Sequence, residues 1–377
     1  MAARVGNVVK PELTIHIGRP KVGSTALQGF LNMNRPALEK HGICYPKTGL
    51  YQGASHHFSL VFLSSLPDHA TVKDVRPEDL YQALADEVAA SGMSRAVISS
   101  ENFWLVKPAR LKPLLREHFD VRIVAYLRRQ DEVLVSSFVQ EIRGGSLSLD
   151  TTMDSYLEDD GRLQLLDYDA ILTGWEQAFG LENVSVRLHE AMQEGIERDF
   201  LQVLGITSHK HFRFFDTRSN ASPALDLLRM LETMHGFPVG DLTRRQLSGI
   251  LTKVSEHVGI EDGLDPKGLI SNQQRRQVMA QFTDSNERLF ARHPCDGMRF
   301  PEVKDEAVTA AREVPEPERE LRALLGIIAY QQRQILILTN RVSHLERRNE
   351  NPHEKPPAVT APKRNFWARL RQRLGLH

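Results

Sequence analysis

A run of residues near the amino terminus has the composition of a binding site for an anion. Residues 16–28 read His-Ile-Gly-Arg-Pro-Lys-Val-Gly-Ser-Thr-Ala-Leu-Gln. Alternating apolar side chains over 13–17 predict a strand that ends at Gly18, and leucine and phenylalanine at helical spacing predict a helix over 24–32. A loop between a strand and a helix presents free backbone amides and the positive end of the helix dipole. The segment therefore predicts a cradle for a phosphate-like group.

The side chains of this loop favour the same chemistry. Lys21 supplies a mobile positive charge, and the hydroxyls of Ser24 and Thr25 add two hydrogen-bond donors in the first helical turn. Gly23 permits a positive φ or a close approach of the backbone. The loop differs from a Walker A motif because its lysine precedes the glycine instead of following it. The alternative is an ordinary strand–helix turn that happens to contain lysine and glycine.

A second segment, 126–138, combines an arginine with a serine eight residues later. Arg128 stands where a predicted strand ends, and Ser136 lies on the predicted helix that follows. An arginine fork beside a hydroxyl suits a terminal phosphate monoester. Arg129 and Ser137 have the same spacing, so the register stays open, with Arg128 preferred because it lies nearest to the end of the strand. Taken alone, such a pair also fits a solvated helix face.

Together the two segments resemble the cofactor-binding motifs of sulfotransferases that use 3′-phosphoadenosine 5′-phosphosulfate (PAPS). The run Pro-Lys-x-Gly-Ser-Thr after the first strand is similar to the loop with which this family binds the 5′-phosphosulfate. The resemblance implies that Lys21 also stabilises charge on the leaving phosphate oxygen. It further implies that the 5′-phosphosulfate is bound by Arg19, Lys21, Gly23, Ser24 and Thr25.

The arginine–serine pair is similar to the second signature of the family, which binds the 3′-phosphate of the cofactor. The resemblance assigns this role to Arg128 and Ser136. Val22 departs from the family pattern, which usually has threonine or serine at that position, so one hydroxyl is lost while the loop backbone is kept. The likeness extends over roughly 13–292. A third, glycine-rich motif is not visible, and the residues that bind the adenine are not identified.

A carboxylate and a histidine are candidates for the base that takes the proton of an acceptor hydroxyl. Glu101 follows the predicted strand 95–99 and should lie at the same sheet edge as Arg128, where open α/β sheets bind their ligands. It resembles the glutamate base of carbohydrate sulfotransferases, and a positioned base contributes roughly 10²–10⁴-fold to a rate. A helix N-cap or a structural ion pair is the alternative role. His57, or its neighbour His56, offers a second candidate base.

Strand and helix patterns alternate along most of the chain. Such alternation predicts an α/β fold, a three-layer sandwich with a mostly parallel sheet covered by helices on both faces. The resemblance implies the P-loop NTPase-like fold of the sulfotransferases. The predicted strands are 13–17, 95–99, 121–127 and 184–188, and the predicted helices are 24–32, 80–90, 132–143 (with Asp131 as N-cap and Gly144 as stop) and 168–179, followed by a helical part over 223–300.

The composition changes in the last fifth of the chain. Residues 1–312 form the predicted sulfotransferase domain, and 313–320, which contains acidic residues and two prolines, a linker. Over 321–348 apolar residues recur by three and four through four heptads, which predicts a self-associating coiled-coil helix, with a helix packed on the domain as the alternative. A proline-rich linker and a basic amphipathic tail follow in 349–377. The tail could contact a membrane surface or an acidic partner through 363–374, or it could simply be solvated.

Bulk composition favours a cytoplasmic globular enzyme. The chain has 377 residues, 41% of them hydrophobic, and a formal net charge of zero, so no chain-wide attraction to nucleic acid is expected. Its two cysteines cannot form a disulfide framework, and no residue spacing suggests a metal site. No signal-peptide core or membrane-spanning apolar run is visible, so we expect a cytoplasmic protein, with peripheral contact at the inner membrane surface as an option.

The sequence thus predicts transfer of the sulfuryl group of PAPS to a hydroxyl or amine acceptor. A glycan or polysaccharide precursor is the expected acceptor by family analogy alone. Phe103 and Trp104, next to Glu101, could stack on a sugar or could belong to the core. Two alternatives are a P-loop-type kinase or phosphotransferase, and a non-catalytic coiled-coil scaffold with a vestigial nucleotide site.

Overall fold

The computed structural model divides the chain into two units, of which the first comprises 1–138, 152–220 and 270–305. The residues that the structure describes are 10–18, 22–63, 72, 74–144, 153–192, 194–214, 269–303, 331, 335, 337–339, 341 and 342. The predicted features outside these residues are Arg19, Lys21, most of the helical part before residue 269, the linker 313–320 and the tail 349–377.

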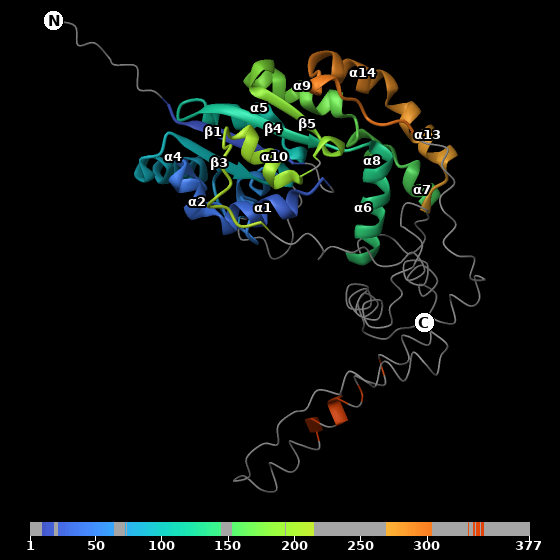
Figure 1. The fold of residues 1–377 in the computed structure, drawn as a ribbon, viewed down its shortest axis with the longest axis horizontal. Helices are drawn as coiled ribbons and strands as arrows, with labels where there is room; N and C mark the ends of the chain where they lie inside the picture. Colours follow the sequence, from blue (N-terminus) through green and yellow to red (C-terminus); the bar gives the residue numbers. More distant parts are fainter. Residues whose placement is uncertain are drawn as a thin grey trace, which may run out of the picture. The chain divides into compact units, whose positions relative to one another are not determined.

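The first unit is built on a five-stranded sheet in the order β2-β3-β1-β4-β5 (Figure 1). Each pair of neighbouring strands is parallel. The predicted α/β fold with a mostly parallel sheet is therefore confirmed. The sequence did not predict β2, which has only two residues and too short an apolar run to stand out. The strands are β1 (Glu12–His16), β2 (Ile43–Cys44), β3 (Arg95–Ser99), β4 (Asp120–Leu127) and β5 (Val184–Leu188).

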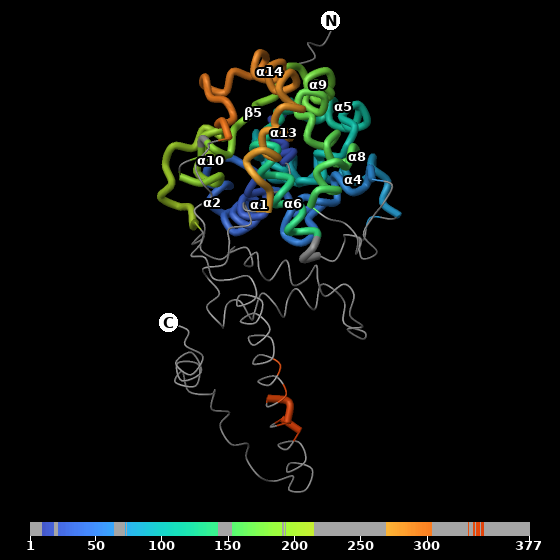
Figure 2. The backbone as a smooth tube through the Cα atoms, turned by 90° about the vertical axis from the view of Figure 1, so that its right-hand side faces the viewer, coloured from blue at the N-terminus to red at the C-terminus, as the bar shows by residue number. Residues whose placement is uncertain are grey.

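Helices cover both faces of this sheet. Figure 2 shows α1, α2 and α10 on one side and α5, α9 and α14 on the other. On the first side the helices share an apolar core with Val97 and Tyr126 of the strands. Leu13 and Ile98, which alternate to the opposite face, are also fully buried. The described helices are α1 (Ser24–Met33), α2 (Arg35–Lys40), α3 (His57–Leu60), α4 (Pro77–Ser91), α5 (Pro108–Leu115), α6 (Gln130–Gly144), α7 (Met153–Leu157), α8 (Asp160–Gln164), α9 (Tyr168–Phe179), α10 (Ile196–Val203), α13 (Asn272–Gln281) and α14 (Thr283–Arg292), with short 3-10 turns η1 (Glu101–Leu105), η2 (Leu181–Asn183), η3 (His189–Ala191) and η8 (Cys295–Gly297).

The N-cap predicted for the helix that follows β4 is wrong. Asp131 was expected to be the N-cap of the helix that follows β4, but α6 already begins at Gln130. The carboxylate of Asp131 is fully buried and binds two guanidinium groups instead of the helix amides. Arg129 bonds it through Nε at 2.6 Å and through a terminal nitrogen at 3.0 Å, and Arg275 of α13 bonds it at 2.5 Å. This ion cluster joins the start of α6 to α13.

The second unit contains the predicted coiled-coil segment, of which a few positions are described. Residues 331, 335, 337–339, 341 and 342 are helical. Ile335, Leu338 and Val342, which belong to the apolar three-and-four repeat that predicts the coiled coil, expose 55%, 57% and 51% of their surface. Self-association through 321–348 stays a prediction.

None of the helices in the described part of the chain is both long enough and apolar enough to cross a bilayer.

Replacing Asp131 with alanine should destabilise the fold strongly. The substitution leaves the buried Arg129 and Arg275 without their shared counter-charge, and breaking a buried ion pair from one side costs about 3–5 kcal/mol. Urea unfolding measures this loss. The control is Glu78→Ala, which removes an exposed ion pair with Arg76 and should change the free energy of unfolding by at most about 1 kcal/mol. Equal effects of the two substitutions would show that the buried cluster contributes no special stability.

Candidate functional site

Three strand ends meet at one edge of the sheet. His16, the last residue of β1, pairs with Ser99, the last residue of β3, and with Val124 of β4. The chain leaves β1 toward β2 on one side and leaves β4 toward β5 on the other, so the strand order reverses between β1 and β4. Open parallel sheets bind ligands outside the carboxyl ends of their strands at such a point. The predicted loop, Glu101 and Arg128 all follow strands that end at this edge.

The loop between β1 and α1 is described at both of its ends. Gly23 precedes α1 with a φ of 90°, a conformation that favours glycine, and the amide of Leu27 bonds its carbonyl at 3.1 Å as the first helical bond. Ser24 is buried while Thr25 is exposed, and Val22 is fully buried in the core shared by α1 and α10. Val22 therefore contributes an apolar side chain to the core at the position where the similar loop of the sulfotransferases usually has threonine or serine. The predicted roles of Arg19 and Lys21 lie outside the described residues.

His16 lies fully buried at the base of this loop. Its Nδ1 is 2.7 Å from the hydroxyl of Ser99, and its Nε2 has no hydrogen-bond partner. The ring makes edge contacts with Tyr126 and Phe200 at centroid distances of 5.6 and 5.9 Å. Burial lowers the pKa of His16 from 6.5 to about 3, so the imidazole is neutral at neutral pH.

Glu101 begins the turn η1, two residues beyond β3. The side-chain amide of Gln28 donates to Glu101 Oε2 at 2.5 Å, so the first helix after the loop holds the candidate base. The cap of η1 is Ser100, whose hydroxyl accepts from the amide of Asn102 at 3.2 Å. The alternative role of Glu101 as the N-cap is therefore wrong, because its neighbour takes that position.

The two adjacent histidines have different surroundings. His56 is buried, with Nδ1 2.8 Å from the hydroxyl of Ser100, which is in turn 2.8 Å from the hydroxyl of Ser59. Burial lowers the pKa of His56, and the charge of Glu101 opposes part of this shift. His57 is half-buried and stacks on Tyr51 at 5.4 Å. Burial lowers the pKa of His57, and electrostatic repulsion from the neighbouring His56 lowers it further. The structure thus brings His56, rather than the predicted His57, into the hydrogen-bonded group next to Glu101.

The two candidate arginines also differ. Arg129 is buried, and besides Asp131 its guanidinium bonds the carbonyl oxygens of Pro301 and Glu302 at 3.1 and 3.3 Å. Arg128 is half-buried at the end of β4, where its Nε bonds Glu132 at 2.6 Å. Arg129 is therefore committed to holding the fold together, whereas Arg128 stays at the sheet edge.

The remaining predicted residues are placed as follows. Ser136 and Ser137 are both half-buried on α6, so their burial does not decide between the pair Arg128–Ser136 and the pair Arg129–Ser137. Phe103 and Trp104 are buried, and the Trp104 indole donates to the carbonyl of Leu165 at 3.0 Å. Of the two alternatives for this aromatic pair, membership of the core is confirmed.

Reasoning from the sequence did not assign roles to His16, Gln28 or Ser100. His16 and Gln28 are the first and last residues of the run 16–28. Only the fold shows that His16 contacts Ser99 of β3 and that Gln28 contacts Glu101 in the turn after β3. A histidine between Ile15 and Ile17 at the end of the predicted strand was the available signal for His16.

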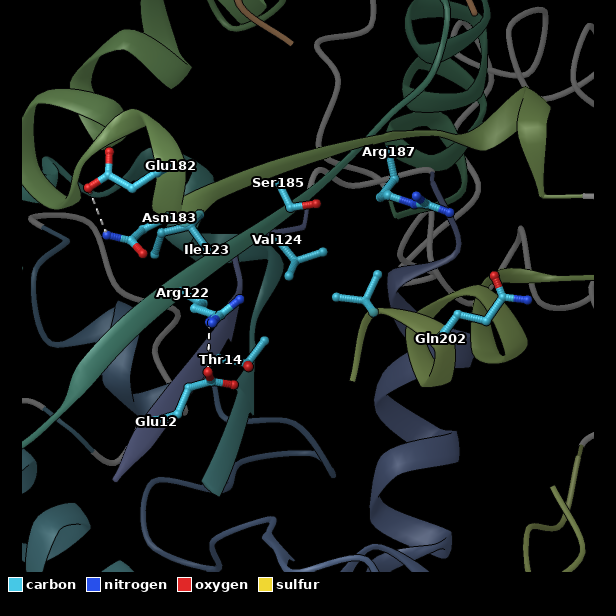
Figure 3. A pocket seen from close by; sticks show the side chains of 11 residues that line it. Glu12, Thr14, Arg122, Ile123, Val124, Glu182, Asn183, Ser185, Arg187 and Gln202 are labelled. Atoms are coloured by element: carbon cyan, nitrogen blue, oxygen red, sulfur yellow. Dashed lines mark hydrogen bonds and ion pairs between the residues drawn. The ribbon is translucent and has the colours of Figure 1, made fainter. Parts of the chain in front are cut away.

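A separate pocket of about 270 Å³ lies over β1, β4 and β5 beside α10 (Figure 3). Glu12, the first residue of β1, lines it and pairs with Arg122 at 2.7 Å. Its other arginine, Arg187, is paired with Asp199. The pocket begins at the opposite end of β1 from His16, away from the sheet edge that the loop, Glu101 and Arg128 follow, so it is not the candidate anion site. Among the described residues no group of three or more His, Cys, Asp and Glu could hold a metal ion.

No family model matches this chain. An uncharacterized protein of Archaeoglobus fulgidus is 27% identical over 172 residues, so the match spans less than half of that relative, 45% of its length and 45% of this chain. A crystal structure of a sulfotransferase from Alicyclobacillus acidocaldarius gives a TM-score of 0.44 at 18% identity, over 75% of this chain and 96% of that one. The α/β assignment rests on the strand order and pairing given above.

The buried His16 should make stability fall with decreasing pH. The unfolded chain takes up a proton on this residue below its ordinary pKa of 6.5, whereas the folded chain does so only near pH 3. Between pH 7 and pH 4 the difference removes up to about 3 kcal/mol from the free energy of unfolding. Urea unfolding at pH 7 and pH 4 should show that the free energy of unfolding of His16→Asn falls less than that of wild type, by this amount. The exposed His211 supplies the control substitution, and an equal loss in wild type and His16→Asn would contradict the prediction.

Proposed function

We propose that this chain is a sulfotransferase that moves the sulfuryl group of PAPS to a hydroxyl or amine acceptor. The observation that carries the proposal is the position of two anion-binding segments at the ends of neighbouring parallel strands. The loop follows β1, and Arg128 follows β4, which pairs directly with β1. The likeness of both segments to the cofactor motifs of this family supplies the identity of the ligand.

The spacing of the two segments suits a nucleotide with phosphate groups on both sides of its ribose. Neighbouring strands lie about 4.8 Å apart, and Arg128 lies four residues beyond Val124, the partner of His16, or roughly 13 Å along the strand direction. One end of the ligand would meet the amides at the start of α1 and Lys21, and the other would meet Arg128 and Ser136. The ion pair with Glu132 orients the Arg128 guanidinium at the strand end. Because Arg129 is committed to Asp131 and to backbone carbonyls, we assign the 3′-phosphate to Arg128.

The residues around Glu101 suit removal of a proton from the acceptor. PAPS supplies an activated sulfuryl group, and by analogy with phosphoryl transfer most of the catalysis is positioning and stabilisation of spread charge. Gln28 holds one oxygen of Glu101, which fixes the direction in which the carboxylate accepts a proton. The loop amides and Lys21 stabilise negative charge on the leaving oxygen. His56 is the second candidate base because it is neutral and lies beside Ser100.

A carbohydrate acceptor is proposed from family resemblance alone. A cytoplasmic location is proposed from the composition and the low cysteine content, and contact of 363–374 with a membrane surface or an acidic partner from the basic amphipathic sequence of that segment. The alternatives are a kinase and a non-catalytic scaffold, and a comparison of nucleotide binding distinguishes both from a sulfotransferase.

Adenosine 3′,5′-bisphosphate should stabilise the protein against thermal unfolding, and ATP with magnesium should not. A ligand at 100 times its Kd adds about 2.7 kcal/mol to the free energy of unfolding. Arg128→Ala should weaken binding of the bisphosphate and leave binding of AMP, which lacks the 3′-phosphate, unchanged. Arg76→Ala, at an exposed position, is the matched control. Stabilisation by ATP with magnesium but not by the bisphosphate would favour the kinase. No stabilisation by either nucleotide would favour the scaffold.

Glu101→Gln should preserve binding of adenosine 3′,5′-bisphosphate but lower turnover by roughly 10²–10⁴-fold, because the amide cannot accept the acceptor proton. Turnover is followed as transfer of radiolabel from PAPS to acceptors in a cell extract. Glu117→Gln, at an exposed position on the segment after α5, is the control and should behave as wild type. A Glu101→Gln enzyme with the wild-type rate would exclude Glu101 as the base and make His56→Ala the decisive variant.

A further inference from the structure

His16 presents an unexplained polar atom in the interior of the protein. The side chain is fully buried, Ser99 binds its Nδ1, and its Nε2 has no partner. An unsatisfied buried polar group costs about 1–3 kcal/mol, and native proteins contain few of them. A ligand that supplies the missing partner would account for this atom.

The unpaired nitrogen points toward the loop that precedes α1. A Cβ atom added to Gly18 would lie 2.8 Å from His16 Nε2 and 2.8 Å from Ser24 Oγ. The two polar atoms therefore converge on one small space between the start of the loop and the first turn of α1. Any residue other than glycine at position 18 would place a Cβ atom too close to both side chains, so glycine is needed where they converge.

The imidazole is held rigidly in a form that can donate from Nε2. Tyr126 and Phe200 pack edge-on against the ring, and Tyr126 is itself fixed by a 2.7 Å hydrogen bond to Asp199. A neutral imidazole carries one proton, and the partner of one nitrogen decides which nitrogen holds it. When the Ser99 hydroxyl donates to Nδ1, the proton is on Nε2. A neutral donor is then aimed at the space beside Ser24.

We propose that His16 is an anion-binding residue of this loop, whose neutral Nε2–H donates a hydrogen bond to a tetrahedral oxyanion held at the amino end of α1. This inference deepens the proposed function, on which the identity of the oxyanion as a sulfonate or a 5′-phosphate depends. It rests on three observations: the orphaned Nε2, its convergence with Ser24 Oγ beside Gly18, and the positive dipole at the start of a ten-residue helix.

Two substitutions separate the roles of the two ring nitrogens. The amide of His16→Asn lies near the position of Nδ1, so it can keep the contact with Ser99 but leaves Nε2 unreplaced. The longer His16→Gln can place an amide donor near the position of Nε2. Binding of adenosine 3′,5′-bisphosphate should weaken roughly 10- to 100-fold in His16→Asn and by less than about 3-fold in His16→Gln, as expected for one hydrogen bond to a charged group.

Adenosine 3′-monophosphate is the control ligand because it lacks the 5′ anion. It should bind wild type and both variants equally. Wild-type affinity of His16→Asn for the bisphosphate would overturn the inference. So would equal losses in both variants, or weakened binding of the 3′-monophosphate, since each would indicate a structural role.

The tautomer of His16 in the full-length protein provides a test that does not depend on nucleotide binding. Long-range proton–nitrogen correlation spectra should show the proton on Nε2, and added inorganic sulfate should shift the Nε2 resonance of wild type. A proton on Nδ1, or a resonance that sulfate leaves unchanged, would overturn the inference. If sulfate shifts this resonance but the bisphosphate does not bind, the anion site stands and the proposed function fails.

Discussion

The parallel pairing of β1 with β3 on one side and with β4 on the other is the interaction on which the rest of the structure depends. It aligns His16 with Ser99 and with Val124, so segments far apart in the sequence leave the sheet at one edge. Each chemical group of the candidate site follows from this alignment. Glu101 comes from the turn after β3, the loop from the end of β1, and Arg128 from the end of β4.

Burial of polar groups at this edge imposes a second constraint, because water cannot satisfy their hydrogen bonds. The amide of Ser55 bonds the carbonyl of Ser99 at 2.9 Å, and the amide of Ser100 bonds the carbonyl of His16 at 3.2 Å. The side chain of His56 follows the same rule by bonding Ser100, and Nε2 of His16 is an exception to it. The groups are therefore fixed in direction before any ligand arrives, which is the condition under which electrostatic stabilisation is most effective.

Much of the fold could be predicted from the sequence because its long strands and helices carry strong periodic patterns. The predicted bounds of β3, β5 and α9 agree with the structure residue for residue. The two-residue β2 gave no such pattern, and α6 started one residue before the cap proposed at Asp131. Local propensity favours aspartate at a cap, but two arginines compete for its carboxylate, one of them from α13.

The candidate site could be predicted only in its parts. Strand–loop–helix and strand–helix junctions are local features, so the loop and Arg128 could be assigned to the same edge. The bond from Gln28 to Glu101 joins residues 73 positions apart, and the choice of His56 over His57 depends on which ring faces Ser100. Such contacts follow from the packing of α1 and α3 against the turn after β3, which no short pattern encodes.

The adjacent Arg128 and Arg129 divide two tasks at one strand end. The second arginine binds the carbonyl oxygens of Pro301 and Glu302, more than 170 positions downstream. The chain beyond α14 thus supports the segment that carries Arg128, the residue proposed to bind the 3′-phosphate. Shortened versions of the protein used for crystallisation or domain mapping need to extend past residue 302, because an earlier end point would remove acceptors that a buried guanidinium depends on.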